Sequence, residues 1–158
     1  MSKVQEFQVE VFADYHQFYV QDGGVNPDAP TDWTDEDVES RAKVSQNVVV
    51  ICPVRNMTVP VSVEVYDSQP SYELSHVDHA IRCSLALPTG GLQIHECTGG
   101  ERLRVSITPG TYGVIALFTG LSLLSEDGLE GEDAYRVLLW PASAMPLEVL
   151  KRWDENAA

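Results

Sequence analysis

The sequence predicts an all-β protein, an antiparallel β-sandwich of about eight to ten strands with one short helix near residues 35–43. Three observations support this fold class. Apolar and polar residues alternate with period two, Gly and Pro separate the alternating stretches, and one segment alone carries a helix-start signal. The chain has 158 residues, 44% of them hydrophobic, so we expect residues 1–158 to form a single sandwich domain.

The first half of the chain contains four predicted strands. Residues 7–11 alternate between apolar and polar, which is typical of a half-buried strand, and residues 15–21 form a second, aromatic one. Residues 47–54 are apolar and β-branched, so we expect that strand to be buried on both faces. Valines alternate over residues 59–65, where Pro60 indicates an edge strand or a bulge because proline donates no ladder hydrogen bond.

The predicted helix begins after Thr34. A threonine followed three residues later by an acidic side chain, here Asp37, matches a capping box. Asp35, Glu36 and Asp37 also suit the positive end of the helix dipole. We therefore expect a helix of about two turns over residues 35–43.

The second half of the chain reads as further strands separated by turns. The dipeptide Pro109-Gly110 marks a tight turn between two neighbouring strands, and residues 121–133 form an acidic loop. The predicted strands cover residues 80–87, 92–97, 103–107, 112–119 and 134–140, with a last strand or short helix over 146–153.

The charge is the unusual feature of the composition. Ten Lys and Arg against 24 Asp and Glu give a formal net charge of −14, which disfavours direct binding to nucleic acid or to an anionic membrane. A basic protein partner fits this charge, as does a role in solubility alone. No apolar run is long enough to span a membrane, and the first residues lack the apolar core of a signal peptide. Without paired spacing, Cys52, Cys83 and Cys97 indicate reduced thiols and a cytoplasmic location.

Three motifs carry a resemblance to a known family. The string YHQFYVQD at 15–22, the string DWTDEDVE at 32–39 and the pair Arg55-Asn56 resemble, in order and spacing, the bacterial competence protein J family. A weaker match, PGTYGVIALF at 109–118, extends the resemblance over much of residues 8–140. The best-known member of that family inhibits a nuclease that acts during DNA uptake. The resemblance implies a small acidic β-sandwich that binds and silences a nuclease, with no catalytic residues.

The first acidic cluster surrounds the helix start. It is open to two interpretations: a capped, solvated helix, or a rigid carboxylate patch that imitates phosphates at a nuclease cleft. An exposed Trp33 beside the carboxylates would serve as an interface anchor. The candidate partner-binding residues of this cluster are Asp32, Trp33, Asp35, Glu36, Asp37 and Glu39.

The second acidic cluster lies in the loop at 121–133. Five carboxylates within eight residues repel one another, so this segment is a solvated loop, a partner-binding loop or a cation site, although the ligand order of an EF-hand is absent. We expect the loop to contribute less to binding than the helix, because anions on a Gly-containing loop lose more freedom. The candidate residues are Glu126, Asp127, Glu130, Glu132 and Asp133.

Metal and cysteine chemistry are weaker alternatives. His76, Asp78 and His79 would need further zinc ligands, such as Cys83 or His95, and a surface loop explains them more simply. The thiols fit inert packing within strands.

Other polar residues also have simple structural interpretations. His16 fits a structural histidine in a strand, and Arg55-Asn56 fits a turn or bulge with a surface ion pair. No nucleophile elbow, phosphate-binding loop or dinucleotide fingerprint is present, so we expect no enzyme, no cofactor and no metal.

The function predicted from these features is non-catalytic. We expect an acidic binding protein that inhibits a partner nuclease by occluding its active site, without direct nucleic-acid contact and without membrane insertion. The alternatives are a β-sandwich interaction domain of another function and, less favoured, a metal-binding protein.

Overall fold

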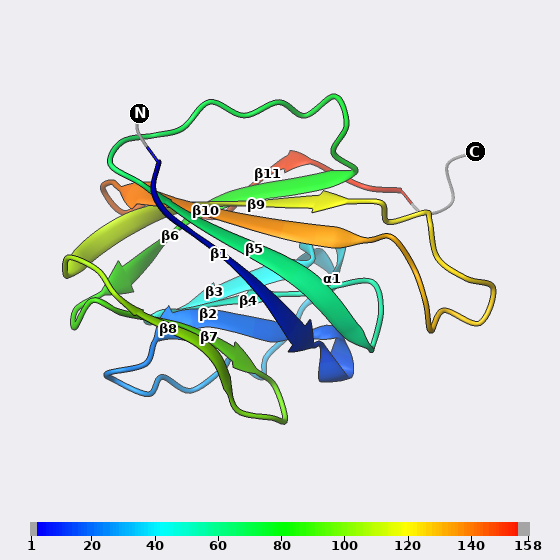
Figure 1. The fold of residues 1–158 in the computed structure, drawn as a ribbon, viewed down its shortest axis with the longest axis horizontal. Helices are drawn as coiled ribbons and strands as arrows, with labels where there is room; N and C mark the ends of the chain where they lie inside the picture. The colour runs from blue at the N-terminus through cyan, green and yellow to red at the C-terminus, as the bar shows by residue number, and fades with distance from the viewer. Residues whose placement is uncertain (1–2, 155–158) are drawn as a thin grey trace.

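The computed structural model describes residues 3–154, which form two stacked β-sheets and one short helix, α1 (Asp35–Ser40) (Figure 1). The prediction of an all-β sandwich is confirmed. The strands are β1 (Lys3–Phe12), β2 (Phe18–Asp22), β3 (Ala42–Ser45), β4 (Val48–Ile51), β5 (Thr58–Tyr66), β6 (His79–Leu87), β7 (Gly91–Glu96), β8 (Glu101–Ser106), β9 (Gly110–Thr119), β10 (Ala134–Pro141) and β11 (Glu148–Lys151).

The two sheets have different strand orders. The six-stranded sheet runs β1-β5-β10-β9-β6-β11, and the five-stranded sheet runs β3-β4-β2-β7-β8. Pairing is antiparallel throughout the described strands, except that β10 runs parallel to β5, with Tyr135 opposite Val61. This parallel pair places the beginnings of β5 and β10 at the same end of the sandwich.

The core lies between the sheets, as the alternation predicts. Val59, Val61 and Val63 of β5 are at most 1% exposed, and they pack with residues such as Phe18 and Phe118 in one continuous cluster. Full burial of one such side chain contributes about 1.5–3 kcal/mol. All residues of β4 are buried, which confirms that this strand is covered on both faces.

A second apolar layer covers the outer face of the six-stranded sheet. Ile115, Leu117 and Trp140 form a buried cluster there, against which Tyr72 and Met145 pack. The segment between β5 and β6 crosses this face in Figure 1 and supplies part of the cover.

Two predicted elements have different boundaries. The expected strand at 15–21 begins only at Phe18, because Asp14–His16 form a 3₁₀ turn, η1, in which Tyr15 and His16 take left-handed φ angles of 56°. The helix ends at Ser40 instead of residue 43, because Arg41 is left-handed at φ 58°. The chain then enters β3, a strand that the sequence did not reveal.

The expected position of Pro60 was wrong. Pro60 lies in β5, an inner strand, with no register shift beside it. Opposite it, the carbonyl of Glu10 points away from β5, since it accepts a 2.9 Å hydrogen bond from Nε of Arg102. Glu10 and Pro60 are therefore a pair without ladder hydrogen bonds, and pairing with β10 starts only at Val61. The missing N–H of Pro60 costs no hydrogen bond there.

Two further connections differ from or complete the sequence prediction. Pro109-Gly110 does not close a hairpin, because β8 and β9 belong to different sheets. The last element, left open as strand or helix, is the strand β11, which pairs with β6.

Gly113 allows close packing at one position of β9. A Cβ atom on Gly113 would lie 2.4 Å from the ring of Trp140, whereas one on Gly100 would meet nothing within 4 Å. We expect Gly113→Ala to lower the free energy of unfolding by about 1–3 kcal/mol through overpacking. Gly100→Ala, the matched control, should change it by less than about 0.5 kcal/mol. Urea denaturation measures both values, and equal effects would contradict this account of Gly113.

Candidate functional site

Both acidic clusters lie at the same end of the sandwich. Figure 1 shows α1, η1 and the loop at 121–133 together at this end. The segment 52–56, which leaves β4, contacts the C-cap of α1, the turn η1 and the acidic loop. The N–H of Cys52 donates to the carbonyl of Arg41 at 3.0 Å, the ring Nδ1 of His16 donates to the carbonyl of Pro53 at 3.1 Å, and Arg55 reaches into the acidic loop.

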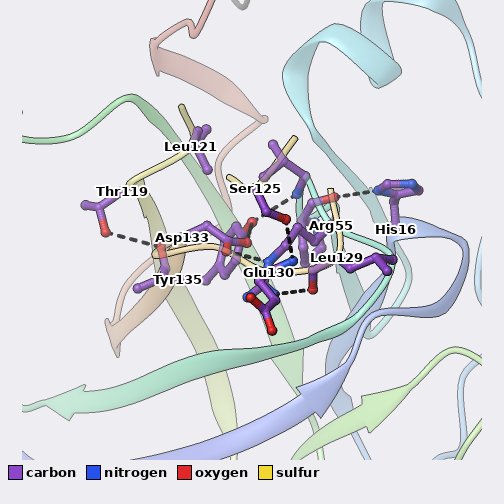
Figure 2. A network of polar contacts seen from close by, with 12 residues as sticks. His16, Arg55, Thr119, Leu121, Ser125, Leu129, Glu130, Asp133 and Tyr135 are labelled. Atoms are coloured by element: carbon purple, nitrogen blue, oxygen red, sulfur yellow. Dashed lines mark hydrogen bonds and ion pairs between the residues drawn. The ribbon is translucent and has the colours of Figure 1, made fainter. Parts of the chain in front are cut away.

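A buried ion pair joins this segment to the acidic loop (Figure 2). Nε of Arg55 donates to Oδ1 of Asp133 at 2.7 Å, and these side chains are only 8% and 0% exposed. The hydroxyl of Tyr135 donates to the other carboxylate oxygen at 2.7 Å and accepts from the N–H of Val54 at 2.9 Å. Nη1 of Arg55 also donates to the carbonyl of Leu129 at 3.1 Å. Burial, with the bond to Asp133, raises the pKa of Tyr135 far above its ordinary value.

This arrangement corrects two expectations. Arg55 does not form a surface ion pair, because its partner is a buried carboxylate far along the chain. Asp133 was expected to contact a partner, but it is 1% exposed and its oxygens are occupied by Arg55 and Tyr135. It is a structural residue and is removed from the candidate binding surface.

The acidic loop is folded into a small hairpin. The N–H of Ser125 donates to the carbonyl of Glu130 at 2.7 Å, and that of Glu132 donates to the carbonyl of Leu123 at 3.0 Å. Oδ1 of Asp127 accepts from the Ser125 hydroxyl at 2.6 Å and from the N–H of Leu129 at 3.0 Å. The hydroxyl bond lowers the pKa of Asp127. The side chains of Glu126, Asp127, Glu130 and Glu132 are exposed on this hairpin, beside Leu123 and Leu129.

The capping box predicted at the helix start is confirmed. The N–H of Asp37 donates to Oγ1 of Thr34 at 3.2 Å, and the N–H of Thr34 donates to Oδ2 of Asp37 at 2.9 Å. Nζ of Lys43 donates to the same oxygen of Asp37 at 2.6 Å, and this hydrogen bond lowers the pKa of Asp37. Trp33 is half-buried and its Nε1 donates to the carbonyl of Pro30 at 3.2 Å. Asp37 and Trp33 therefore have structural contacts of their own.

The outward carboxylates of α1 differ in their surroundings. Nη2 of Arg152 lies 2.7 Å from Oε1 of Glu36, and its Nη1 lies 3.5 Å from Oε2 of Glu39. Asp32 and Asp35 are exposed, with only a 4.0 Å contact from Lys43 to Asp32. Arg152 thus offsets part of the negative charge on the helix.

His79 ties the helix to the end of the chain. It was expected in a surface loop, yet it is fully buried, and its Nε2 donates to the carbonyl of Ser40 at 2.6 Å. Its Nδ1 accepts from the N–H of Trp153 at 3.1 Å, so both ring nitrogens are used by the neutral form. Burial lowers the pKa of His79. The neighbouring Asp78 accepts from the N–H of Leu121, where the acidic loop begins, at 2.8 Å.

The other chemical candidates receive little support from the geometry. Within residues 3–154, no three His, Cys, Asp or Glu side chains are arranged to hold a metal ion. Cys52, Cys83 and Cys97 are free, and burial raises the pKa of both Cys52 and Cys83 to about 12. Over the same residues no helix is long and apolar enough to cross a membrane.

The chain matches the family model of competence protein J (ComJ) over residues 10–139, which is most of its length. It belongs to the competence protein J family. The crystal structure of ComJ from Bacillus subtilis, an inhibitor of the DNA degrading activity of NucA, has a similar fold, with a TM-score of 0.65 and 17% identity over 89% of this chain and 98% of that one. Crocagin biosynthetic gene J is also similar, with a TM-score of 0.57 and 17% identity over 90% of this chain and 100% of its own. No curated protein sequence gives a significant match.

The buried pair gives a prediction about this family member's stability. We expect Arg55→Met to lower the free energy of unfolding by about 3–5 kcal/mol, because it leaves the carboxylate of Asp133 buried and unpaired. Cleavage within residues 121–132 during limited proteolysis should also become faster. Arg82→Met, which breaks an exposed ion pair with Glu148, should cost less than about 1 kcal/mol. A similar loss in both variants would contradict the role assigned to Arg55.

His79 gives a pH dependence. Because burial holds its pKa below the ordinary value of 6.5, the unfolded chain takes up a proton at His79 before the folded protein does. This contribution to the free energy of unfolding is complete above pH 6.5 and is lost as the pH falls below it. We expect His79→Gln to flatten that fall between pH 7 and 5, measured by urea denaturation. His76→Gln, at an exposed position, should leave the pH profile unchanged; a parallel profile for His79→Gln would contradict the prediction.

Proposed function

We propose that this protein is a nuclease inhibitor that acts by binding a partner nuclease. The observation that carries the proposal is its membership of the competence protein J family, supported by its similarity in fold to a NucA inhibitor. Inhibition by binding requires no catalytic group in the inhibitor. The raised thiol pKa values of Cys52 and Cys83 agree with this, because the nucleophilic form of a cysteine is the thiolate. A cytoplasmic location belongs to the same proposal.

We place the binding surface at the end of the sandwich that carries α1 and the acidic hairpin. A formal net charge of −14 accelerates encounter with a basic partner, and a surface rich in carboxylates complements a cleft built to hold DNA phosphates. Occlusion of that cleft would then block cleavage sterically. The exposed carboxylates that serve this role are Asp32, Asp35, Glu36, Glu39, Glu126, Asp127, Glu130 and Glu132.

The hairpin is the stronger half of this surface, contrary to the expectation from sequence. Its backbone is held by internal hydrogen bonds and by Arg55, so its anions lose little freedom on binding. Among residues 3–154, no cation pairs with the carboxylates of Glu126 or Glu130, whereas Glu36 and Glu39 share Arg152. The hairpin therefore presents charge that only a partner neutralises.

The test is titration of a nuclease with the protein while DNA cleavage is measured. The nucleases are NucA of Bacillus subtilis and any nuclease encoded beside this chain's gene. We expect the double reversal E126K/E130K to raise the concentration for half-inhibition by about tenfold or more, and E36K/E39K to raise it less. Both variants change the net charge by the same amount, so long-range attraction is matched and only placement differs.

The outcomes separate the parts of the proposal. If the wild-type protein inhibits neither nuclease in tenfold excess, the proposed function is wrong. Equal losses of inhibition in the two double variants would assign the effect to the net negative charge of the whole protein. A larger loss of inhibition in E36K/E39K would move the interface to α1. Circular dichroism of each variant checks that the fold is retained.

A further inference from the structure

We propose that Tyr15 is the aromatic anchor of the nuclease-binding surface and that the left-handed turn η1 serves to present it. This inference rests on the proposed function and adds the residue on which binding depends most. Tyr15 is absent from the residues that sequence reasoning selected, because the alternation placed it inside a strand, where an aromatic side chain would pack.

The conformation of the turn is unfavourable for the residues that occupy it. Tyr15 and His16 are consecutive non-glycine residues at φ 56°. Left-handed backbone is uncommon for residues other than Gly; Asn, Asp and His adopt it more readily, whereas it is costly for a bulky side chain such as that of Tyr15. Strained backbone of this type concentrates at functional sites.

The fold gains little from the ring of Tyr15. Tyr15 is 69% exposed, which is the largest exposed fraction of any large hydrophobic residue within residues 3–154. A tyrosine that neither packs in the core nor relieves the turn has no evident structural purpose. A large, exposed aromatic side chain is instead characteristic of a binding hot spot.

The backbone around Tyr15 is held firmly. The N–H of Ala13 donates to the carbonyl of Met57 at 3.0 Å, and that of His16 donates to Oδ1 of Asn56 at 3.2 Å. Asp14 accepts the N–H of Tyr15 at 3.1 Å and the hydroxyl of Thr98 at 2.7 Å. The backbone that carries the ring is therefore held in place, which reduces the entropy lost on binding.

The turn and the acidic hairpin share one support. His16 bonds to the carbonyl of Pro53, and two residues later Arg55 bonds to the carbonyl of Leu129 (Figure 2). The turn η1, which carries Tyr15, thus lies at the same end of the molecule as the loop at 121–133 (Figure 1), whose Leu123 and Leu129 are exposed. Apolar anchors surrounded by charged residues are the usual anatomy of a protein interface.

The chemistry of the turn indicates which part of the partner it meets. The hydrogen bond from Thr98 lowers the pKa of Asp14, so this carboxylate is an anion directly before the ring of Tyr15. An anion followed by a flat ring presents the two features of one nucleotide, its phosphate and its base. Nuclease clefts hold phosphates with cations, and aromatic rings attract Lys and Arg. The partner face is therefore the positively charged, nucleotide-binding cleft of the nuclease.

The experiment separates the ring from the turn. Gly takes a φ of 56° without strain, so Tyr15→Gly should keep the folded structure while raising the concentration for half-inhibition at least tenfold. Tyr15→Asn, which also tolerates this backbone, repeats the test with a second side chain. Tyr15→Phe keeps the ring and should inhibit within threefold of wild type. Val4→Ala removes an exposed apolar side chain at the other end of β1 and should have no effect.

The probes are the two nucleases used for the proposed function, with urea denaturation of each variant as the stability control. If wild type inhibits and the folded Tyr15→Gly and Tyr15→Asn variants inhibit equally well, the anchor role is overturned while the proposed function stands. A Tyr15→Phe variant as weak as Tyr15→Gly would also overturn the role of the ring. Failure of wild type to inhibit would instead reject the proposed function itself.

Discussion

The ion pair between Arg55 and Asp133 is the interaction on which the candidate surface depends. Removing two charges from water is costly, and their attraction offsets this cost only when the remaining hydrogen-bonding positions are filled. Here Tyr135 and the carbonyl of Leu129 fill several of them. The pair fixes the base of a loop whose other carboxylates repel one another. Without a buried cation at this point, that repulsion would favour an open loop, and the exposed side chains would lose their common orientation.

The topology explains why so many functional candidates converge. β5 and β10 are parallel, so the segments that precede them, 52–57 and 121–133, emerge side by side. β1 is antiparallel to β5 with Phe12 opposite Thr58, so the turn that follows β1 reaches the same end. Ala42 lies opposite Ile51, which brings the helix before β3 there as well. The parallel pair β5–β10 and the antiparallel pairs β1–β5 and β3–β4 thus bring four distant segments to one end of the sandwich.

The sequence predicted what local patterns determine. Local apolar patterns and turn residues identified nine of the strands within residues 3–154, while the last was left open as strand or helix. The capping box at Thr34 is confirmed, because such signals depend on residues a few positions apart. The family motifs were also sufficient to identify the family. The errors concern long-range pairing or backbone handedness. Asp133 and Arg55 are 78 positions apart, so nothing local distinguishes Asp133 from its exposed acidic neighbours. Tyr15 alternates like a strand residue, and its left-handed backbone depends on partners such as Asn56.

The unpaired charge and the strained turn have a common physical meaning. Each raises the free energy of the isolated protein, and the fold sustains them because the core and the Arg55 network stabilise the chain elsewhere. A basic partner would neutralise the carboxylates of the hairpin and give the exposed ring of Tyr15 a contact. A partner that binds the folded protein but not the unfolded chain stabilises the folded protein, so the features that weaken the free protein are those that would strengthen a complex. Rigidity at the base of the surface preserves both features until a partner binds. A mobile turn would relax the backbone strain at Tyr15, and a mobile loop would move the carboxylates of the hairpin apart.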